Sequence, residues 1–95
     1  MATVLVSPRA RRNLERLIET HSLPPSTVAR FVASLEPLAA FPSLGAPLQG
    51  RWSAYRFILG PWRWMLIIYQ YAEDRDVVGI VTVQDARSSS AATSE

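Results

Sequence analysis

The segment from residue 51 to residue 71 constrains the fold of this chain most strongly. It contains all three tryptophans and all three tyrosines of the sequence, together with three of the ten arginines. Gly60 and Pro61 lie at its midpoint and separate two runs rich in aromatic and branched side chains, a pattern typical of strands. We therefore expect a β-hairpin in which Gly60 and Pro61 are the two turn residues and Leu59 faces Trp62.

The two faces of this expected hairpin differ in character. Residues that pair across an antiparallel ladder share a face, so the pattern assigns every side chain to one side. We expect the apolar face to lie beneath helices. On the other face, Arg56 and Arg63 would lie diagonally across the ladder, close enough to bind one anion together. The first face would present Tyr55, Phe57, Leu59, Trp62, Trp64, Leu66 and Ile68, and the second Trp52, Arg56, Ile58, Arg63, Met65, Ile67 and Tyr69.

The composition is that of one small globular domain. Apolar residues make up 48% of the 95 residues and charged residues only 19%, which favours a compact fold over a disordered chain. The chain has no cysteine and one histidine, so we expect neither a disulfide nor a zinc or iron site, and no motif predicts a cofactor. Its N-terminus does not resemble a signal peptide and its apolar runs are too short to span a bilayer. We expect a soluble, cytoplasmic protein.

Every basic residue other than the histidine is an arginine. Arginine stays ionised and binds phosphates with two parallel hydrogen bonds, but it cannot act as a general base at ordinary pH. The net charge of +2 does not by itself predict nucleic-acid binding, so the placement of the arginines has to decide.

The order of expected elements is β-α-α-β-β-β. Residues 2–6 read as a strand, and Ser7-Pro8 is a signal for a helix start. A second helix should begin near residues 25–26, and Pro37 should end or kink it. A turn-rich connector, the hairpin and a last strand at 77–84 follow. This order predicts an α+β domain over residues 1–87, in which a helical hairpin covers one face of a small, mostly antiparallel sheet, followed by a flexible tail over residues 88–95.

Two single residues have a structural interpretation at this point. His21 lies at the expected junction of the two helices, where a cation suits the negative end of the helix dipole. Asp85 ends the last strand and could pair with Arg87 or with Arg63.

With these residues in this order, the chain resembles the RelE/ParE superfamily of bacterial toxins from type II toxin–antitoxin systems. The resemblance covers residues 2–87. It includes the opening strand and helix VLVSPRARRNLERLI, the Pro-x-x-Gly connector at Pro42–Gly45, and the segments Tyr55-Arg56 and Gly60-Pro61-Trp62-Arg63. The last strand, VTVQDAR, ends in a basic residue, Arg87, as it does in the family.

The resemblance implies a toxin, and most directly a RelE-like, ribosome-dependent mRNA endonuclease that inhibits translation. By match of position, Arg56 and Arg63 would hold phosphate, with Arg87 as a third such residue, and charge stabilisation of this kind is a large share of catalysis. Two alternatives stay open: a ParE-like, non-enzymatic inhibitor of DNA gyrase, and a degenerate toxin that only binds its antitoxin. The partners implied are an antitoxin and either the ribosome with its mRNA or gyrase.

The sequence departs from the nuclease pattern in its acid–base groups. The tyrosine that often follows the hairpin arginine by three residues is Leu66 here, Asp85 stands near the place of a frequent histidine, and no tyrosine follows Arg87. Tyr69 would share the arginine face and is the tyrosine that we expect to complete the catalytic set of Arg56, Arg63 and Arg87.

We also expect the antitoxin to fold a C-terminal segment onto this domain. The expected open face carries Trp52, Met65, Ile67 and Tyr69, which is more apolar surface than a monomer normally exposes. Acidic side chains of the antitoxin could then occupy the place of substrate phosphates.

Overall fold

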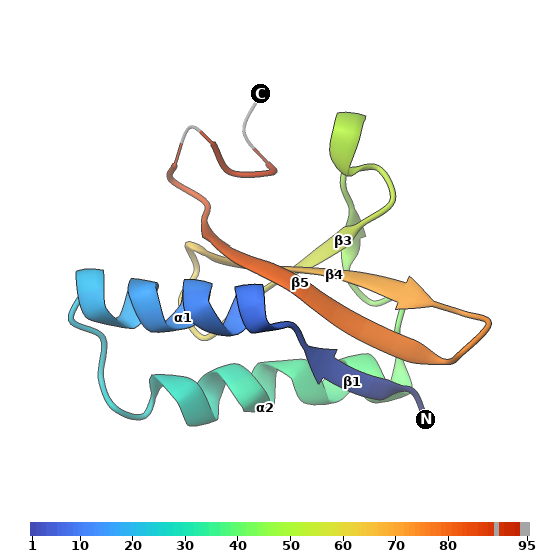
Figure 1. Cartoon of the computed structure of the whole chain (residues 1–95), viewed down its shortest axis with the longest axis horizontal. Helices are drawn as coiled ribbons and strands as arrows, with labels where there is room; N and C mark the ends of the chain where they lie inside the picture. The colour runs from blue at the N-terminus through green and yellow to red at the C-terminus, as the bar shows by residue number, and fades with distance from the viewer. Residues whose placement is uncertain (89, 94–95) are drawn as a thin grey trace.

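The computed structural model describes residues 1–88 and 90–93, and its fold confirms the expected α+β class (Figure 1). Five strands form one sheet in the order β1-β5-β4-β3-β2, with β1 parallel to β5 and the other neighbours antiparallel. The elements are β1 (Thr3–Val6), α1 (Pro8–Thr20), α2 (Thr27–Ala40), β2 (Ala46–Pro47), the short 3-10 helix η1 (Gly50–Trp52), β3 (Arg56–Leu59), β4 (Met65–Ala72) and β5 (Val77–Asp85).

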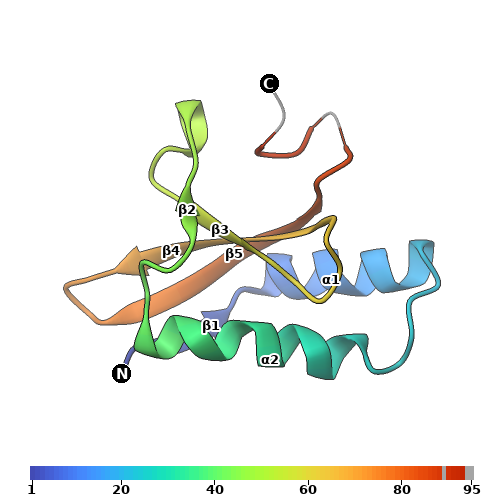
Figure 2. The ribbon, with the colours of Figure 1, turned by 180° about the vertical axis from the view of Figure 1, so that it is seen from behind.

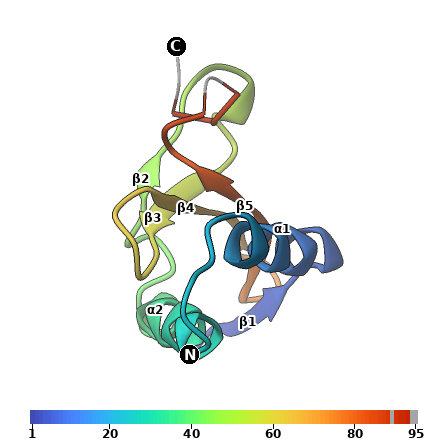
Figure 3. The same ribbon diagram turned by 90° about the vertical axis from the view of Figure 1, so that its left-hand side faces the viewer.

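The two helices begin where local signals place them. The Ser7 hydroxyl accepts a hydrogen bond from the Ala10 N–H at 3.0 Å, and Pro8 occupies the first helical position, where a missing N–H costs nothing. Pro37 lies inside α2, which continues to Ala40. The helices lie on the same side of the sheet, as expected (Figures 1 and 3).

The helices cover the opposite hairpin face from the one we expected. Met65, Ile67 and Tyr69 are completely buried in the main core, where they pack with apolar side chains from both helices. The prediction that these three residues lie on an open face is therefore wrong, and so is the antitoxin surface built on them. The hairpin alone does not decide which face is covered, because the helices also pack against β5. The apolar side chains Val78, Ile80 and Val83 of β5 lie on the same side of the sheet as Met65, Ile67 and Tyr69.

The other sheet face is also covered, but by irregular chain. Leu66 and Ile68 are as deeply buried as the main core, although they lie outside that cluster. In Figure 3 the β2–η1 arm and the C-terminal segment lie above the sheet while the helices lie below it. Within the described part of that segment Ala91 is buried, and the Ala92 N–H donates to Gln84 Oε1 at 2.7 Å. Residues 89, 94 and 95 of the expected flexible tail lie outside the described residues.

The hairpin turn is longer than the expected two residues. Arg56 pairs with Tyr69 and Leu59 with Leu66, and the Gly60 N–H donates to the Met65 carbonyl at 2.9 Å to close the loop. The predicted register is wrong, because Leu59 faces Leu66 and not Trp62. The register differs by an even number of residues, so each strand residue stays on its predicted face. The residues between Leu59 and Met65 lie in the loop and not in the ladder. Figure 2 shows this loop reaching toward the helices, where Trp62 and Trp64 pack against the core.

No helix in the described residues is long and apolar enough to cross a membrane.

Candidate functional site

Two of the expected site residues, Arg56 and Tyr69, hold the connector between α2 and β2. Arg56 Nη1 donates to the Gly45 carbonyl at 2.7 Å and, more weakly, to the Ser43 carbonyl at 3.4 Å. The Tyr69 hydroxyl accepts from the Gly45 N–H at 2.8 Å. Both polar groups of one buried glycine are therefore satisfied by two side chains that pair across β3 and β4. The Pro-x-x-Gly connector is fixed to the sheet at this point.

Tyr69 is enclosed as well as hydrogen-bonded. Its side chain is completely buried, and burial raises the pKa of the phenol, an effect that the hydrogen bond from Gly45 and the charge of Arg56 only partly offset. A phenol with a raised pKa is a weaker acid and keeps its proton at neutral pH, so its phenolate form is scarcely available as a base.

The expected pairing of Arg56 with Arg63 across the ladder is wrong. Arg56 faces Tyr69, whereas Arg63 lies in the loop beyond the last hairpin pair, Leu59 with Leu66. Three strand residues alone span about 10 Å. The two arginines are therefore not neighbours across the ladder, and Arg56 is already hydrogen-bonded to the Gly45 carbonyl.

The β3–β4 loop instead brings Arg63 beside the end of β5. The Ala86 N–H donates to the Trp64 carbonyl at 2.7 Å, so Arg63 and Arg87 flank the two residues that make this hydrogen bond. Arg63 and Arg87 are both largely exposed. Of the four expected site residues, Arg56 thus pairs with Tyr69, whereas Arg63 and Arg87 each adjoin one residue of the hydrogen bond between Ala86 and Trp64.

Arg87 is held by Asp85 and Trp64. Asp85 Oδ1 accepts from both the backbone N–H and Nε of Arg87, and Oδ2 accepts from Nη2, each at 2.9 Å. The guanidinium carbon lies 4.6 Å from the centre of the Trp64 ring, within the range of a cation–π contact. Of the two partners that the sequence suggested for Asp85, the structure shows Arg87.

These contacts shift the pKa values of both Asp85 and Arg87. The hydrogen bonds from Arg87 hold the pKa of Asp85 at about 2, below the usual 3.8, and hydrogen bonding to Asp85 raises the pKa of Arg87. Both groups are charged at any physiological pH.

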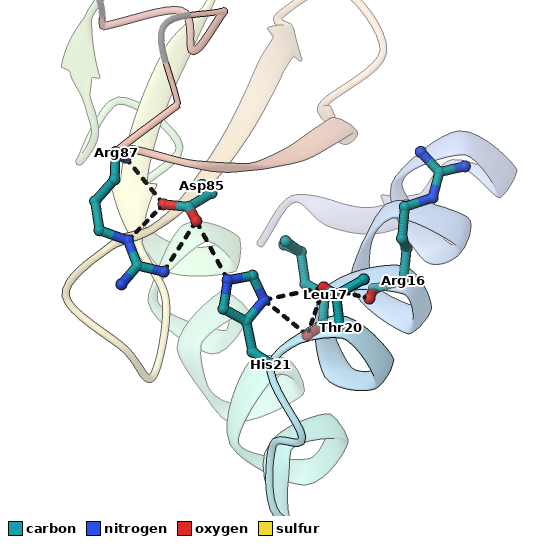
Figure 4. Close-up of polar contacts among 6 residues, drawn as sticks. All are labelled: Arg16, Leu17, Thr20, His21, Asp85 and Arg87. Carbon is teal, nitrogen blue, oxygen red and sulfur yellow. Dashed lines mark hydrogen bonds and ion pairs between the residues drawn. The ribbon is translucent and has the colours of Figure 1, made fainter.

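His21 joins the same cluster from the other end of the sequence (Figure 4). Its Nε2 lies 3.4 Å from Asp85 Oδ2, and its ring stacks on Trp64 with centroids 4.6 Å apart and planes inclined by 27°. Its Nδ1 lies 3.2 Å from the Leu17 carbonyl and 3.0 Å from the Thr20 hydroxyl. The interpretation of His21 as the residue at the end of the first helix is confirmed, because it is the C-cap of α1.

We name the four residues His21, Trp64, Asp85 and Arg87 the tip cluster. Sequence reasoning found Arg87 and its pairing with Asp85, but it missed that Trp64 and His21 contact them. Nothing in the spacing of the sequence signals these contacts, because the four residues come from the α1–α2 junction, the β3–β4 loop and the end of β5. The cluster can bind an anion through Arg87, with Arg63 nearby.

Comparisons with known proteins agree with this fold. Residues 4–89 match the sequence profile of the ParE toxin of type II toxin–antitoxin systems, parDE. The toxin–antitoxin complex RelBE2 from Mycobacterium tuberculosis contains a chain that is 24% identical, with a TM-score of 0.65 over 88% of this chain and 96% of that one.

Two further solved structures share the fold. YafQ from E. coli is 13% identical, with a TM-score of 0.60 over 90% of this chain and 93% of its own. The conserved hypothetical protein HP0892 from Helicobacter pylori is 18% identical, with a TM-score of 0.59 over 90% and 94%. No curated protein matches the sequence.

Proposed function

This chain belongs to the ParE toxin family of type II toxin–antitoxin systems, and we propose that it inhibits translation by cleaving messenger RNA on the ribosome. The observation that supports the proposal is the arrangement of Arg87. Asp85 engages one edge of the guanidinium and Trp64 its face, while more than half of the side chain stays exposed. A fixed guanidinium with outward donors suits a phosphodiester.

In this proposal Arg63 and Arg87 hold the phosphate at which the ribose 2′-hydroxyl attacks. Two cations beside that phosphate offset the charge that develops on its oxygens, which is a large share of catalysis in reactions of this type. We propose that Arg56 and Tyr69 contribute by holding the connector, since both of their side chains are engaged with Gly45.

One observation favours the alternative of a ParE-like toxin that inhibits gyrase by binding alone. A nuclease of this type needs groups that give and take protons. The Tyr69 phenol is buried, and both ring nitrogens of the single histidine face acceptors of the protein itself. On the ribosome, RNA or ribosomal groups would have to supply the missing acid–base function.

Expression of the chain in bacterial cells distinguishes these possibilities. Cuts in messenger RNA at a fixed codon position support the nuclease, and an SOS response with intact transcripts supports gyrase inhibition. Normal growth with a folded product supports a degenerate toxin. The Arg63→Ala, Arg87→Ala double variant should abolish the cuts, whereas Arg75→Ala, in the exposed β4–β5 turn, should not. Cuts that persist in the double variant would contradict the assignment of Arg63 and Arg87 to the cleavage site.

We further propose that the antitoxin binds the groove between α1, α2 and β1. The groove has a volume of about 340 Å³ and is lined mostly by apolar side chains, of which Val28 and Val32 are about half exposed. Arg11 and Glu15 are the charged residues of its lining, and Arg9, Arg12 and Arg16 are exposed elsewhere on α1. An amphipathic antitoxin segment with acidic residues fits this combination.

Co-expression with the product of a neighbouring antitoxin gene tests this surface. Val28→Asp with Val32→Asp should abolish co-purification of the antitoxin while the circular dichroism spectrum of the toxin stays unchanged. Leu44→Asp is the matched control, because Leu44 is equally exposed but lies on the connector. Loss of binding in the control alone would place the antitoxin elsewhere.

A further inference from the structure

We propose that His21 is a positioning residue for Arg87, and that protonation of His21 raises the affinity of Arg87 for a phosphodiester. This inference rests on the proposed role of Arg87 as a phosphate-binding residue. It concerns a residue from the α1–α2 junction, 66 positions from Arg87 in the sequence, which Figure 4 shows directed at the carboxylate that holds Arg87.

Arg87 keeps free donors on one edge of its guanidinium. Guanidinium has five N–H donors, and Asp85 uses Nε and one N–H of Nη2. The remaining donors lie on the edge away from Asp85, and a phosphate needs two donors on one edge. Asp85 therefore orients Arg87 and does not block it. Because the Trp64 ring lies against the guanidinium, the side chain has less rotational freedom to lose when it binds.

His21 contacts both residues that hold Arg87. Its ring stacks on Trp64, and its Nε2 faces the same oxygen of Asp85, Oδ2, that accepts from Arg87 Nη2. A displacement of the imidazole would release Trp64 on one side and the carboxylate on the other. His21 thus acts on Arg87 through these two neighbours without touching the phosphate.

The two ring nitrogens of His21 face different partners. Nδ1 lies 3.2 Å from the Leu17 carbonyl, which can only accept, and this contact favours the tautomer that carries a proton on Nδ1. The nearby Thr20 hydroxyl directs its own proton to the Arg16 carbonyl at 2.9 Å and is an acceptor for Nδ1 as well. In that tautomer of the neutral imidazole, Nε2 would point a lone pair at the Asp85 carboxylate. Only the imidazolium donates to both neighbours.

The charge of the cluster therefore depends on His21. With neutral His21, Asp85 and Arg87 cancel; with protonated His21 the cluster carries one net positive charge. The other charged groups around it are Arg63 in the β3–β4 loop, Arg16 and Glu19 on α1, and Arg30 on α2. Arg30 lies over Trp62 at 5.5 Å, and Figure 4 shows the Arg16 guanidinium directed away from His21. Only Asp85 pairs directly with His21 among the described residues.

Binding of a phosphodiester at different pH values tests the proposal on the full chain. The probe is a fluorescent six-residue 2′-O-methyl RNA, which cannot be cleaved and whose diesters keep one charge each between pH 5.5 and 8. Over this range histidine side chains titrate. One added charge near the phosphate should tighten binding by about three- to tenfold at pH 5.5 relative to pH 8.

Two substitutions at His21 make the test specific. His21→Gln stays neutral, so the RNA should bind weakly at both pH values. His21→Arg stays charged and can stack on Trp64, so binding should be tight at both. Arg75→Gln removes a cation at the far end of the sheet and should keep the pH dependence of the wild type. If His21→Gln keeps that dependence, or if His21→Arg shows it, the proposal is overturned.

A second measurement separates this inference from the proposed function. The NMR signal of the Arg87 Nε–H should shift as His21 titrates in the wild type and stay constant in His21→Gln. A constant signal in the wild type overturns the positioning role even if Arg87 is essential for toxicity. A shifting signal supports the role, and the absence of RNA cuts in cells that express the wild type would then contradict the proposed function alone.

Discussion

Arg56 and Tyr69 face each other across the β3–β4 ladder and together hold Gly45, one through its carbonyl and the other through its N–H. This arrangement makes the connector part of the sheet. It also separates two roles that the sequence alone combined, because Arg56 and Tyr69 are tied to the connector while Arg63 and Arg87 lie at the opposite end of the hairpin.

Tyr69→Phe should destabilise the fold. The substitution leaves the buried Gly45 N–H without an acceptor, which costs about 1–3 kcal/mol. Urea unfolding followed by tryptophan fluorescence measures the change. Tyr55→Phe, at a partly exposed site, is the control and should have little effect. Unchanged stability together with lost toxicity would instead give Tyr69 a chemical role.

Gly45→Ala should also destabilise the fold, for a steric reason. A Cβ at this position would lie 2.6 Å from the Phe57 carbonyl oxygen and 2.7 Å from Tyr69 Cε1, and neither atom can move without disturbing the sheet. We expect a loss of about 1–3 kcal/mol in the free energy of unfolding.

Gly79→Ala is the matched control, since its Cβ would meet only the Gln70 carbonyl oxygen at 3.9 Å. An alanine that fits a strand changes stability by less than about 1 kcal/mol, often favourably. Equal losses at both positions would contradict the close packing around Gly45.

The local signals of the sequence predicted the elements, and long-range packing decided the site. Ser7-Pro8 fixes the start of α1 because a cap acts over three residues. The Gly60-Pro61 signal predicted the hairpin correctly, but not its register. Trp62 and Trp64 leave the ladder to pack against the core, which lengthens the loop. His21 reaches Trp64 and Asp85 only in the folded chain, so neither spacing nor composition could place it there.

Asp85 should make the stability of the fold depend on acid pH. Its pKa is about 2 in the folded chain, mainly because of the hydrogen bonds from Arg87, and its ordinary value is 3.8. The unfolded chain therefore binds this proton first as the pH falls. The contribution of Asp85 is complete above about pH 4 and is lost as the pH falls toward 2.

Urea unfolding between pH 5 and pH 2 checks this prediction by comparing the wild type with Asp85→Asn. The difference in stability between them should shrink as the pH falls. Asp74→Asn, in the exposed β4–β5 turn, should follow the wild type throughout. A difference that stays constant down to pH 2 would show that the ion pair does not contribute.

Asn13 protects the edge of β5 that β1 does not reach. β1 ends at Val6 opposite Ile80, and beyond this pair the free edge of β5 carries backbone groups that need partners. Asn13 Oδ1 accepts from the Val83 N–H at 3.2 Å and from the Thr82 hydroxyl at 2.6 Å. Asn13 of α1 thus supplies hydrogen bonds to β5 beyond the point where β1 ends and the chain continues as α1.

Asn13→Ala should therefore open this edge and loosen the end of β5 that carries Asp85 and Arg87. We expect a loss of about 1–3 kcal/mol in stability, because two partly buried donors lose their acceptor. Hydrogen exchange should speed up at the Val83 amide more than at the Ile67 amide in the neighbouring strand. Arg12→Ala, at the adjacent exposed position, should change neither. Unaltered hydrogen exchange at the Val83 amide in Asn13→Ala would mean that the hydrogen bond to Asn13 does not stabilise this edge.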